Sequence, residues 1–174
     1  MSERRHVVLV GLPGAGKTVV GQRVAELLGA PHVETDAIIV RQMQMPIKRI
    51  FGEFGEMRFR ELERQAVRSA LQEPPAIISP GGGWAAQPGQ IEVARTSALL
   101  IYLRTMALTA AKRIEGDDSR PLVAGQDVLE RIRDVLQTRE PFYTRADREV
   151  KTDARTVEAV AEDVAALARA EAGW

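Results

Sequence analysis

Short, uninterrupted runs of apolar residues recur along the chain and predict buried β-strands. The run HVVLV at 6–10 is β-branched and has no polar alternation, as expected of a strand covered on both faces in a parallel sheet. The run ALLIYL at 98–103 has the same character and suits the centre of the sheet. In all, the pattern predicts strands at 6–10, 31–35, 76–79 and 98–103, with an edge strand at 149–152.

Between these runs, apolar positions follow the spacing of amphipathic helices. In 17–28, for example, Val20 and Val24 share a face with the leucines before Gly29, which ends the helix. Helices are predicted at 17–28, at 36–73 with interruptions near Pro46 and 52–55, and at 107–114, 127–139 and 157–170. Strands that alternate with helices predict an α/β fold in three layers, with a central parallel five-stranded sheet flanked by helices. The 174 residues fit one domain, 1–174.

Composition narrows the functional classes. The chain is 45% apolar and 28% charged, with a formal net charge of zero, and it therefore lacks the basic excess of a general nucleic-acid binder. It has no cysteine, so disulfides and thiolate metal sites are excluded, which fits a reducing cytoplasm. We see neither a secretory signal nor an apolar run of the roughly 20 residues that span a bilayer. We therefore expect a cytoplasmic protein with no nucleic-acid or membrane partner.

A glycine-rich motif follows the first predicted strand. Residues 11–18, GLPGAGKT, match the pattern G-x-x-x-x-G-K-[ST] and open a predicted helix. The glycines let backbone N–H groups turn inward around anionic oxygens, and the helix N-terminus favours the same phosphates. Lys17 is expected to reach the β- and γ-phosphates, and Thr18 to bind Mg²⁺. The motif predicts a site for a nucleoside triphosphate.

Other chemically suggestive residues follow the second and third predicted strands. Asp36 comes after the second, and Gly81, Gly82 and Gly83 come after the third. Ligands of parallel sheets bind at the carboxyl ends of the strands, so these residues and the glycine-rich motif are expected at one edge.

Several separated motifs, in order, resemble those of shikimate kinase. After the glycine-rich motif come Glu34-Thr35-Asp36, similar to Asp-Thr-Asp in that family, and GEMRFRELE at 55–63, similar to G-E-x-x-F-R-x-x-E. The triple glycine 81–83, RPL at 120–122 and REPFY at 139–143 complete the series. The resemblance extends from the first strand to about residue 150 and implies a P-loop fold related to the nucleoside monophosphate kinases.

The resemblance implies phosphorylation of shikimate to shikimate 3-phosphate by ATP with Mg²⁺, in chorismate biosynthesis. It implies a substrate-binding segment at about 36–63, a mobile lid at about 114–125 and, by analogy, a monomer. Arg120 in the lid would neutralise charge on the transferred phosphoryl group, and Arg113 would stack on adenine. The implied nucleotide-binding residues are Gly14, Ala15, Gly16, Lys17, Thr18, Val19, Arg113 and Arg120.

For the acceptor, the resemblance assigns the shikimate carboxylate to Arg60 and Arg139, whose planar guanidinium groups pair with both oxygens. Asp36 would accept hydrogen bonds from the ring hydroxyls and orient the attacking one, so that Asp36, Lys17 and Arg120 form the catalytic set. The glycines 81–83 would let the backbone approach the ring. Metal contacts are expected from Thr18, from Glu34 through water and from Ser79.

Simpler roles exist for some of these residues. Asp36 could cap a helix, Arg60 could form a surface ion pair with Glu63, and Arg139 could do so with Glu140. Arg113 could lie on a solvated helix face.

The chain also departs from the family pattern. Glu34 replaces an aspartate, Val40 replaces a usual glutamate, and Trp84 is bulkier than the usual small residue. These departures bear on the acceptor pocket and leave two alternatives to shikimate phosphorylation. One is a related small-molecule kinase, gluconate- or nucleotide-kinase-like, and the other is a non-catalytic ligand-sensing domain.

Overall fold

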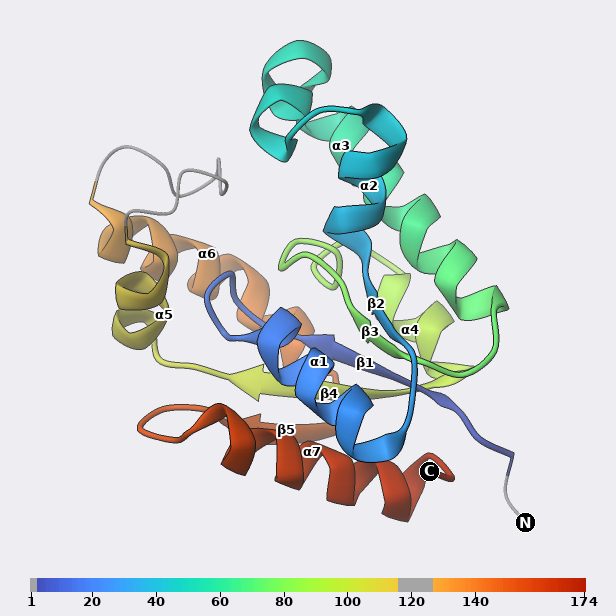
Figure 1. Ribbon diagram of the computed structural model, residues 1–174. Helices are drawn as coiled ribbons and strands as arrows, with labels where there is room; N and C mark the ends of the chain where they lie inside the picture. The colour runs from blue at the N-terminus through green and yellow to red at the C-terminus, as the bar shows by residue number, and fades with distance from the viewer. Residues whose placement is uncertain (1–2, 116–126) are drawn as a thin grey trace.

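The computed structural model describes residues 3–115 and 127–174. Its centre is a five-stranded, all-parallel sheet in the order β2-β3-β1-β4-β5 (Figure 1), which confirms the predicted α/β architecture. The strands are β1 His6–Val10, β2 His32–Glu34, β3 Ile77–Ser79, β4 Ala98–Arg104 and β5 Arg148–Lys151.

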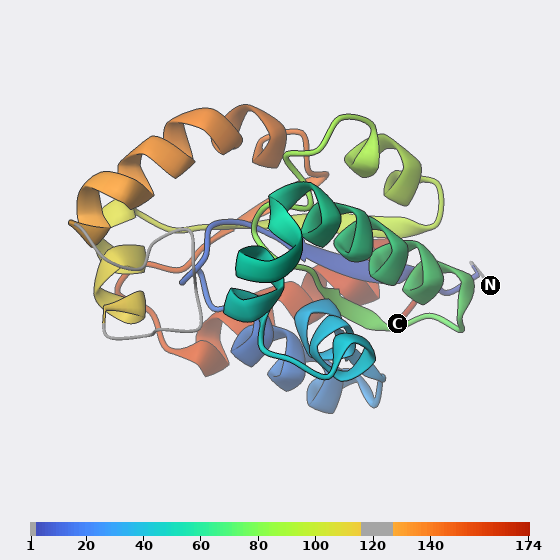
Figure 2. The same cartoon turned by 90° about the horizontal axis from the view of Figure 1, so that it is seen from above.

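Helices connect the strands and cover both faces of the sheet. Helices α1 and α7 lie on one face, and α4 and α6 lie on the other (Figures 1 and 2). The bounds are α1 Lys17–Leu28, α2 Thr35–Met43, α3 Ile47–Gln72, α4 Gln90–Arg95, α5 Ala107–Ile114, α6 Val128–Tyr143 and α7 Val157–Glu171. This is the expected three-layer arrangement, and it puts every strand-to-helix turn at the carboxyl edge.

The main hydrophobic core lies on both faces of the central strands. All five residues of β1 are buried, as are the first six of β4, which explains why their sequences show no polar alternation. The apolar faces of α1 and α7 pack against this sheet, with Val24 and Val164 fully buried. Trp84 also points into this core, with 1% of its surface exposed, so its bulk fills the interior behind the triple glycine.

A second, smaller hydrophobic cluster joins α2 to α3. Ile39 of α2 packs with Ile50, Phe59 and Leu62 of α3. Gly55 has φ +83° and interrupts the helical geometry of α3, as the glycines around 52–55 predicted. The apolar side chains of this cluster pack most of segment 36–63 together, and Arg60 lies on the part of α3 that reaches the sheet edge.

Some predicted boundaries were wrong. α4 was not predicted, because its six residues follow a proline- and glycine-containing connection and show little periodicity. α6 runs four residues beyond the predicted end at 139, with Pro141 inside its last turn. Proline there removes one donor but does not end the helix, since Thr144 N–H still donates to the Glu140 carbonyl. The extra turn carries Tyr143 to the sheet edge.

Residues 116–126 lie outside the described ranges, and most of the predicted lid, including Arg120, falls there. In the parts of the chain that the structure describes, no helix is both long enough and apolar enough to cross a membrane.

Candidate active site

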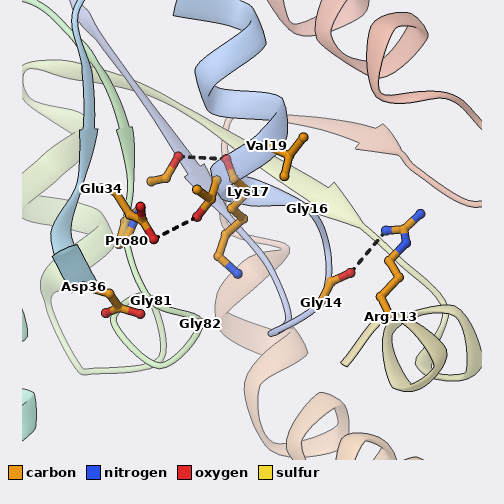
Figure 3. A pocket seen from close by; sticks show the side chains of 12 residues that line it. Gly14, Gly16, Lys17, Val19, Glu34, Asp36, Pro80, Gly81, Gly82 and Arg113 are labelled. Carbon is orange, nitrogen blue, oxygen red and sulfur yellow. Dashed lines mark hydrogen bonds between the residues drawn. The ribbon is translucent and has the colours of Figure 1, made fainter. Parts of the chain in front are cut away.

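A cavity of about 260 Å³ opens at the carboxyl edge of the sheet (Figure 3). It lies where β1, β2 and β3 end, as the positions of the motifs predicted. Its walls come from the P-loop, the start of α2, the triple glycine and α5. The lining residues are Gly14, Gly16, Lys17, Thr18, Val19, Glu34, Asp36, Ser79, Pro80, Gly81, Gly82 and Arg113.

The P-loop forms one wall of this cavity. Lys17 is largely buried, and its ammonium donates to the carbonyl oxygens of Gly11 at 2.8 Å and Leu12 at 2.7 Å. These bonds fold the lysine across the mouth of its own loop, so its charge lies where a phosphate would enter. Ala15 is buried beneath the loop, whereas Val19 is 56% exposed at the start of α1.

A hydroxyl and a carboxylate meet beside the P-loop. Thr18 Oγ1 donates to Glu34 Oε1 at 3.3 Å, so the longer glutamate reaches the threonine directly. Ser79 Oγ donates to the Lys17 carbonyl at 2.8 Å and lies 3.0 Å from His32 Nε2. Burial lowers the pKa of His32, which favours its neutral form. The oxygen atoms of Thr18, Glu34 and Ser79 therefore border one region of the cavity.

Arg113 approaches the P-loop from α5, on the other side from Asp36 (Figure 3). Its Nη1 donates to the Gly14 carbonyl at 3.2 Å and the Ala15 carbonyl at 3.3 Å. The guanidinium is thus held against the loop. Arg113 is nevertheless exposed, so it lies on a solvated helix face, as the alternative role has it, and contacts the P-loop as well.

Asp36 lies across the cavity from the P-loop, beside the triple glycine (Figure 3). The alternative role of Asp36 as a helix cap does not apply, because α2 begins at Thr35 and Glu34 holds the cap position. Asp36 instead stands in the first turn of α2, where the helix dipole favours a negative charge.

Arg60 and Glu63 form an ion pair next to Asp36. Arg60 Nη1 donates to Glu63 Oε1 at 3.0 Å, and Nη2 donates to Glu56 Oε1 at 3.3 Å. The side chain of Glu63 is 1% exposed and that of Arg60 is 14% exposed, so the predicted pair exists but is not on the surface. Burial raises the pKa of Glu63 to about 7; Arg60 opposes this rise, and the nearby charge of Asp36 adds to it.

Arg139 joins this group from the end of α6. It is 9% exposed, and its positive charge opposes the rise that burial causes in the pKa of both Glu63 and Tyr143, which places it near both side chains. The ion pair expected between Arg139 and Glu140 does not occur among the described residues, because Glu140 faces Arg104 at 3.7 Å. Arg60, Arg139 and Asp36 are thus gathered around Glu63.

The triple glycine passes close to these side chains. A Cβ at Gly83 would lie 2.2 Å from Arg60 Nη1, and one at Gly81 would lie 2.5 Å from Glu63 Oε2. A side chain at either position would force the guanidinium of Arg60 or the carboxylate of Glu63 to shift from its observed place. The triple glycine therefore allows a close approach to the backbone, as predicted. In this structure the groups that approach it are the side chains of Arg60 and Glu63.

Three contributors to the site escaped the sequence analysis. Glu63 ends the GEMRFRELE motif, but the only role considered for it was that of a surface partner of Arg60. Gln87 hydrogen-bonds Glu63, and Tyr143 hydrogen-bonds the triple glycine. The REPFY motif was the only signal for Tyr143, and no pattern pointed to Gln87. No cluster of three or more histidine, cysteine, aspartate or glutamate side chains suited to a metal occurs in the described ranges.

Comparison with known proteins identifies similar chains. The profile of the shikimate kinase family matches residues 13–168. A shikimate kinase from Caldicellulosiruptor bescii is 34% identical over 163 residues, covering 94% of this chain and 95% of the relative. The structure of shikimate kinase from Acinetobacter baumannii in complex with shikimate superimposes with a TM-score of 0.92 at 29% identity, covering 96% and 94% of the two chains.

A gluconokinase from Sinorhizobium meliloti shares the architecture more distantly. Its TM-score is 0.68 at 17% identity, covering 99% of this chain and 96% of the other. Similarity at that level shows a common fold only.

Proposed function

The chain belongs to the shikimate kinase family, and we propose that its cavity at the sheet edge holds ATP and shikimate facing each other. The enzyme transfers the γ-phosphoryl group of ATP to a hydroxyl of shikimate, giving ADP and shikimate 3-phosphate. The observation that carries the proposed arrangement is the single cavity lined by both Lys17 and Asp36.

The P-loop side binds the nucleotide. Backbone N–H groups of Gly14, Ala15 and Gly16 surround the phosphates, and the Ala15 N–H gives up its 3.1 Å bond to the Leu12 carbonyl to do so. Lys17 exchanges its bonds to the Gly11 and Leu12 carbonyls for the more strongly attracting phosphate oxygens. Val19, exposed at the start of α1, lies beside the nucleotide. Arg113, fixed against the P-loop, presents its guanidinium plane to adenine.

The acceptor side binds shikimate through two cations and one carboxylate. Arg60 and Arg139 pair with its carboxylate, while Gly81, Gly82 and Gly83 allow the ring to approach the backbone. Asp36 accepts a hydrogen bond from the attacking hydroxyl and takes its proton late, after the bond to the γ-phosphorus has begun to form. Because the transition state is loose, orientation by Asp36 contributes more than its basicity.

The donor set beside the P-loop fits Mg²⁺. Thr18 Oγ1 and Glu34 Oε1 are hard oxygen ligands within 3.3 Å of each other, and Mg²⁺ is commonly held by one or two such groups plus phosphates and water. Thr18 would hold the ion directly, while Glu34 and Ser79 would hold its water molecules. When bound, the ion neutralises charge on the phosphates.

Arg120 lies outside the described residues, and its role in closing over the γ-phosphate remains a prediction. We also propose that the protein is a cytoplasmic monomer, in which the P-loop and Asp36 of one chain line the same cavity.

The test is a coupled assay of ADP release with Mg²⁺-ATP. Turnover that requires shikimate supports the proposal, whereas turnover with gluconate or a nucleoside monophosphate in place of shikimate favours the related-kinase alternative. Shikimate binding measured by calorimetry without any ATP consumption would favour a ligand-sensing domain.

A further inference from the structure

A chain of four polar side chains runs from the surface of α3 to the acceptor pocket. Arg64 donates to the amide oxygen of Gln87, the amide nitrogen of Gln87 donates to Glu63 Oε1 at 2.9 Å, and Glu63 Oε1 also accepts from Arg60 Nη1 at 3.0 Å. Gln87 is the only member that lies outside α3. It therefore links the connection after the triple glycine to the helix that carries Arg60.

The partners of Gln87 fix the orientation of its amide. A guanidinium can only donate, so the atom facing Arg64 has to be the oxygen, and an ionised carboxylate can only accept, so the atom facing Glu63 has to be the nitrogen. The same nitrogen lies 3.4 Å from the carbonyl oxygen of Gly83. Each polar atom of the amide thus has a defined partner.

This contact with Gly83 bears directly on Arg60. The Arg60 guanidinium fills the space where a Cβ of Gly83 would stand, at 2.2 to 2.6 Å from that position. A small shift of the Gly83 backbone would therefore displace the guanidinium or release it. Gln87 contacts both sides of this arrangement. It donates to the carbonyl oxygen of Gly83, and it also donates to Glu63, which in turn binds Arg60.

We propose that Gln87 is a positioning residue for shikimate binding, which holds Glu63 and Gly83 so that the Arg60 guanidinium is ready to meet the substrate carboxylate. Arg64 fixes the amide in the orientation that donates to Glu63. The inference rests on the proposed role of Arg60 as a ligand of shikimate.

The electrostatics of the group agree with this role. Glu63 is buried beside Arg60 of its own helix, Asp36 of α2 and Arg139 of α6, and burial raises its pKa to about 7. With a pKa of about 7, the Glu63 carboxyl group is only partly ionised at neutral pH, and each hydrogen-bond donor that favours the ionised form increases its population. The N–H of Gln87 is such a donor, so its loss should weaken the hold of Glu63 on Arg60.

Two substitutions of nearly equal size separate positioning from packing. Gln87→Met keeps the length of the side chain but removes its hydrogen bonds, while Gln87→Glu keeps the shape and replaces the donor by a second carboxylate. We expect kcat/KM for shikimate to fall about 10-fold in Gln87→Met and further in Gln87→Glu, with KM for ATP within about twofold of wild type. Gln90→Met, at the partly exposed first position of α4, is the matched control.

The pH profile gives a readout that loss of packing would not move. The acidic limb of kcat/KM for shikimate should shift upward in pH in both Gln87 variants, and Arg64→Met should have little effect when Gln87 is already methionine. Wild-type values for Gln87→Met, or equal losses for ATP and shikimate, would overturn the inference.

Arg60→Ala, measured alongside, distinguishes the two levels of failure. If it spares the KM for shikimate, the proposed acceptor site is wrong. If it raises that KM while both Gln87 variants behave as wild type, only the role of Gln87 is wrong.

Discussion

The hydroxyl of Tyr143 donates a 2.6 Å hydrogen bond to the carbonyl oxygen of Gly82. Tyr143 is fully buried at the end of α6, its ring lies 5.3 Å from that of Tyr102, and burial raises its pKa to about 12. The tyrosine stays neutral and keeps its proton for this bond. The position of the triple glycine is thus set by a helix that the sequence places some 60 residues away.

Tyr143→Phe removes this bond and leaves the ring in place. Because the Gly82 carbonyl loses its buried donor, we expect the free energy of unfolding to fall by about 1 to 3 kcal/mol. For a chain of this size that corresponds to a fall in Tm of roughly 2 to 12 °C, measurable by calorimetry. KM for shikimate should rise while KM for ATP stays unchanged. An unaltered Tm would contradict the structural role of the bond.

Lys17→Ala should abolish most of the turnover without unfolding the protein. The ammonium is the side-chain charge that the P-loop offers to the phosphates, and removing one such group from a phosphoryl- or acyl-transfer site costs on the order of 10²-fold or more in kcat. The substitution also leaves the carbonyl oxygens of Gly11 and Leu12 without their donor, so we expect the free energy of unfolding to fall by about 1 to 3 kcal/mol. Lys112→Ala, on the exposed face of α5, is the control, and a normal rate in Lys17→Ala would refute the role of the P-loop.

The local patterns of the sequence were sufficient for the sheet and the P-loop. β1 and β4 are buried on both faces, so their apolar runs carried the signal, and the glycine-rich motif after β1 is a contiguous pattern. The assignment of Arg60 to the acceptor site followed only from the resemblance to a family, because nothing in the sequence around a helical arginine distinguishes a ligand-binding residue from a surface residue.

The contacts of Gln87 and Tyr143 could not be predicted, because they join segments distant in the sequence. Glu63 comes 24 residues before Gln87, and the bond between them depends on how α3 packs beside the triple glycine. The burial of Glu63 likewise depends on that packing, which is why the ion pair with Arg60 was expected on the surface.

Glu34→Ala should weaken the use of Mg²⁺ more than the binding of shikimate. Glu34 contacts Thr18 at 3.3 Å, and loss of a residue that holds a metal-bound water typically costs about 10- to 100-fold in metal affinity. Titration of Mg²⁺ at constant ATP measures the half-saturating concentration. Glu34→Asp keeps the charge, and its half-saturating Mg²⁺ concentration should stay within a few-fold of the wild-type value. An unchanged half-saturating concentration in Glu34→Ala would exclude a role of Glu34 near the ion.

The pKa of Glu63, about 7 in the folded protein, makes a prediction about activity as a function of pH. Ionised Glu63 holds Arg60, so kcat/KM for shikimate should be constant well above pH 7 and fall by up to about tenfold for each pH unit below it. The profile is measured with saturating ATP. Activity that holds constant down to pH 5 would show that binding does not depend on this carboxylate.

The same carboxyl group should affect stability in the opposite direction. Its pKa rises from 4.5 to about 7 on folding, so between these values the folded protein holds a proton that the unfolded chain releases. The stability that this proton contributes is complete below pH 4.5 and is lost as the pH rises through 7. Glu63→Gln mimics the protonated form at every pH, and the excess of its Tm over wild type should therefore be larger at pH 8 than at pH 5. A difference that shrinks with rising pH would mean that Arg60 and Arg139 outweigh burial, because their charges would then favour the ionised carboxylate in the folded state.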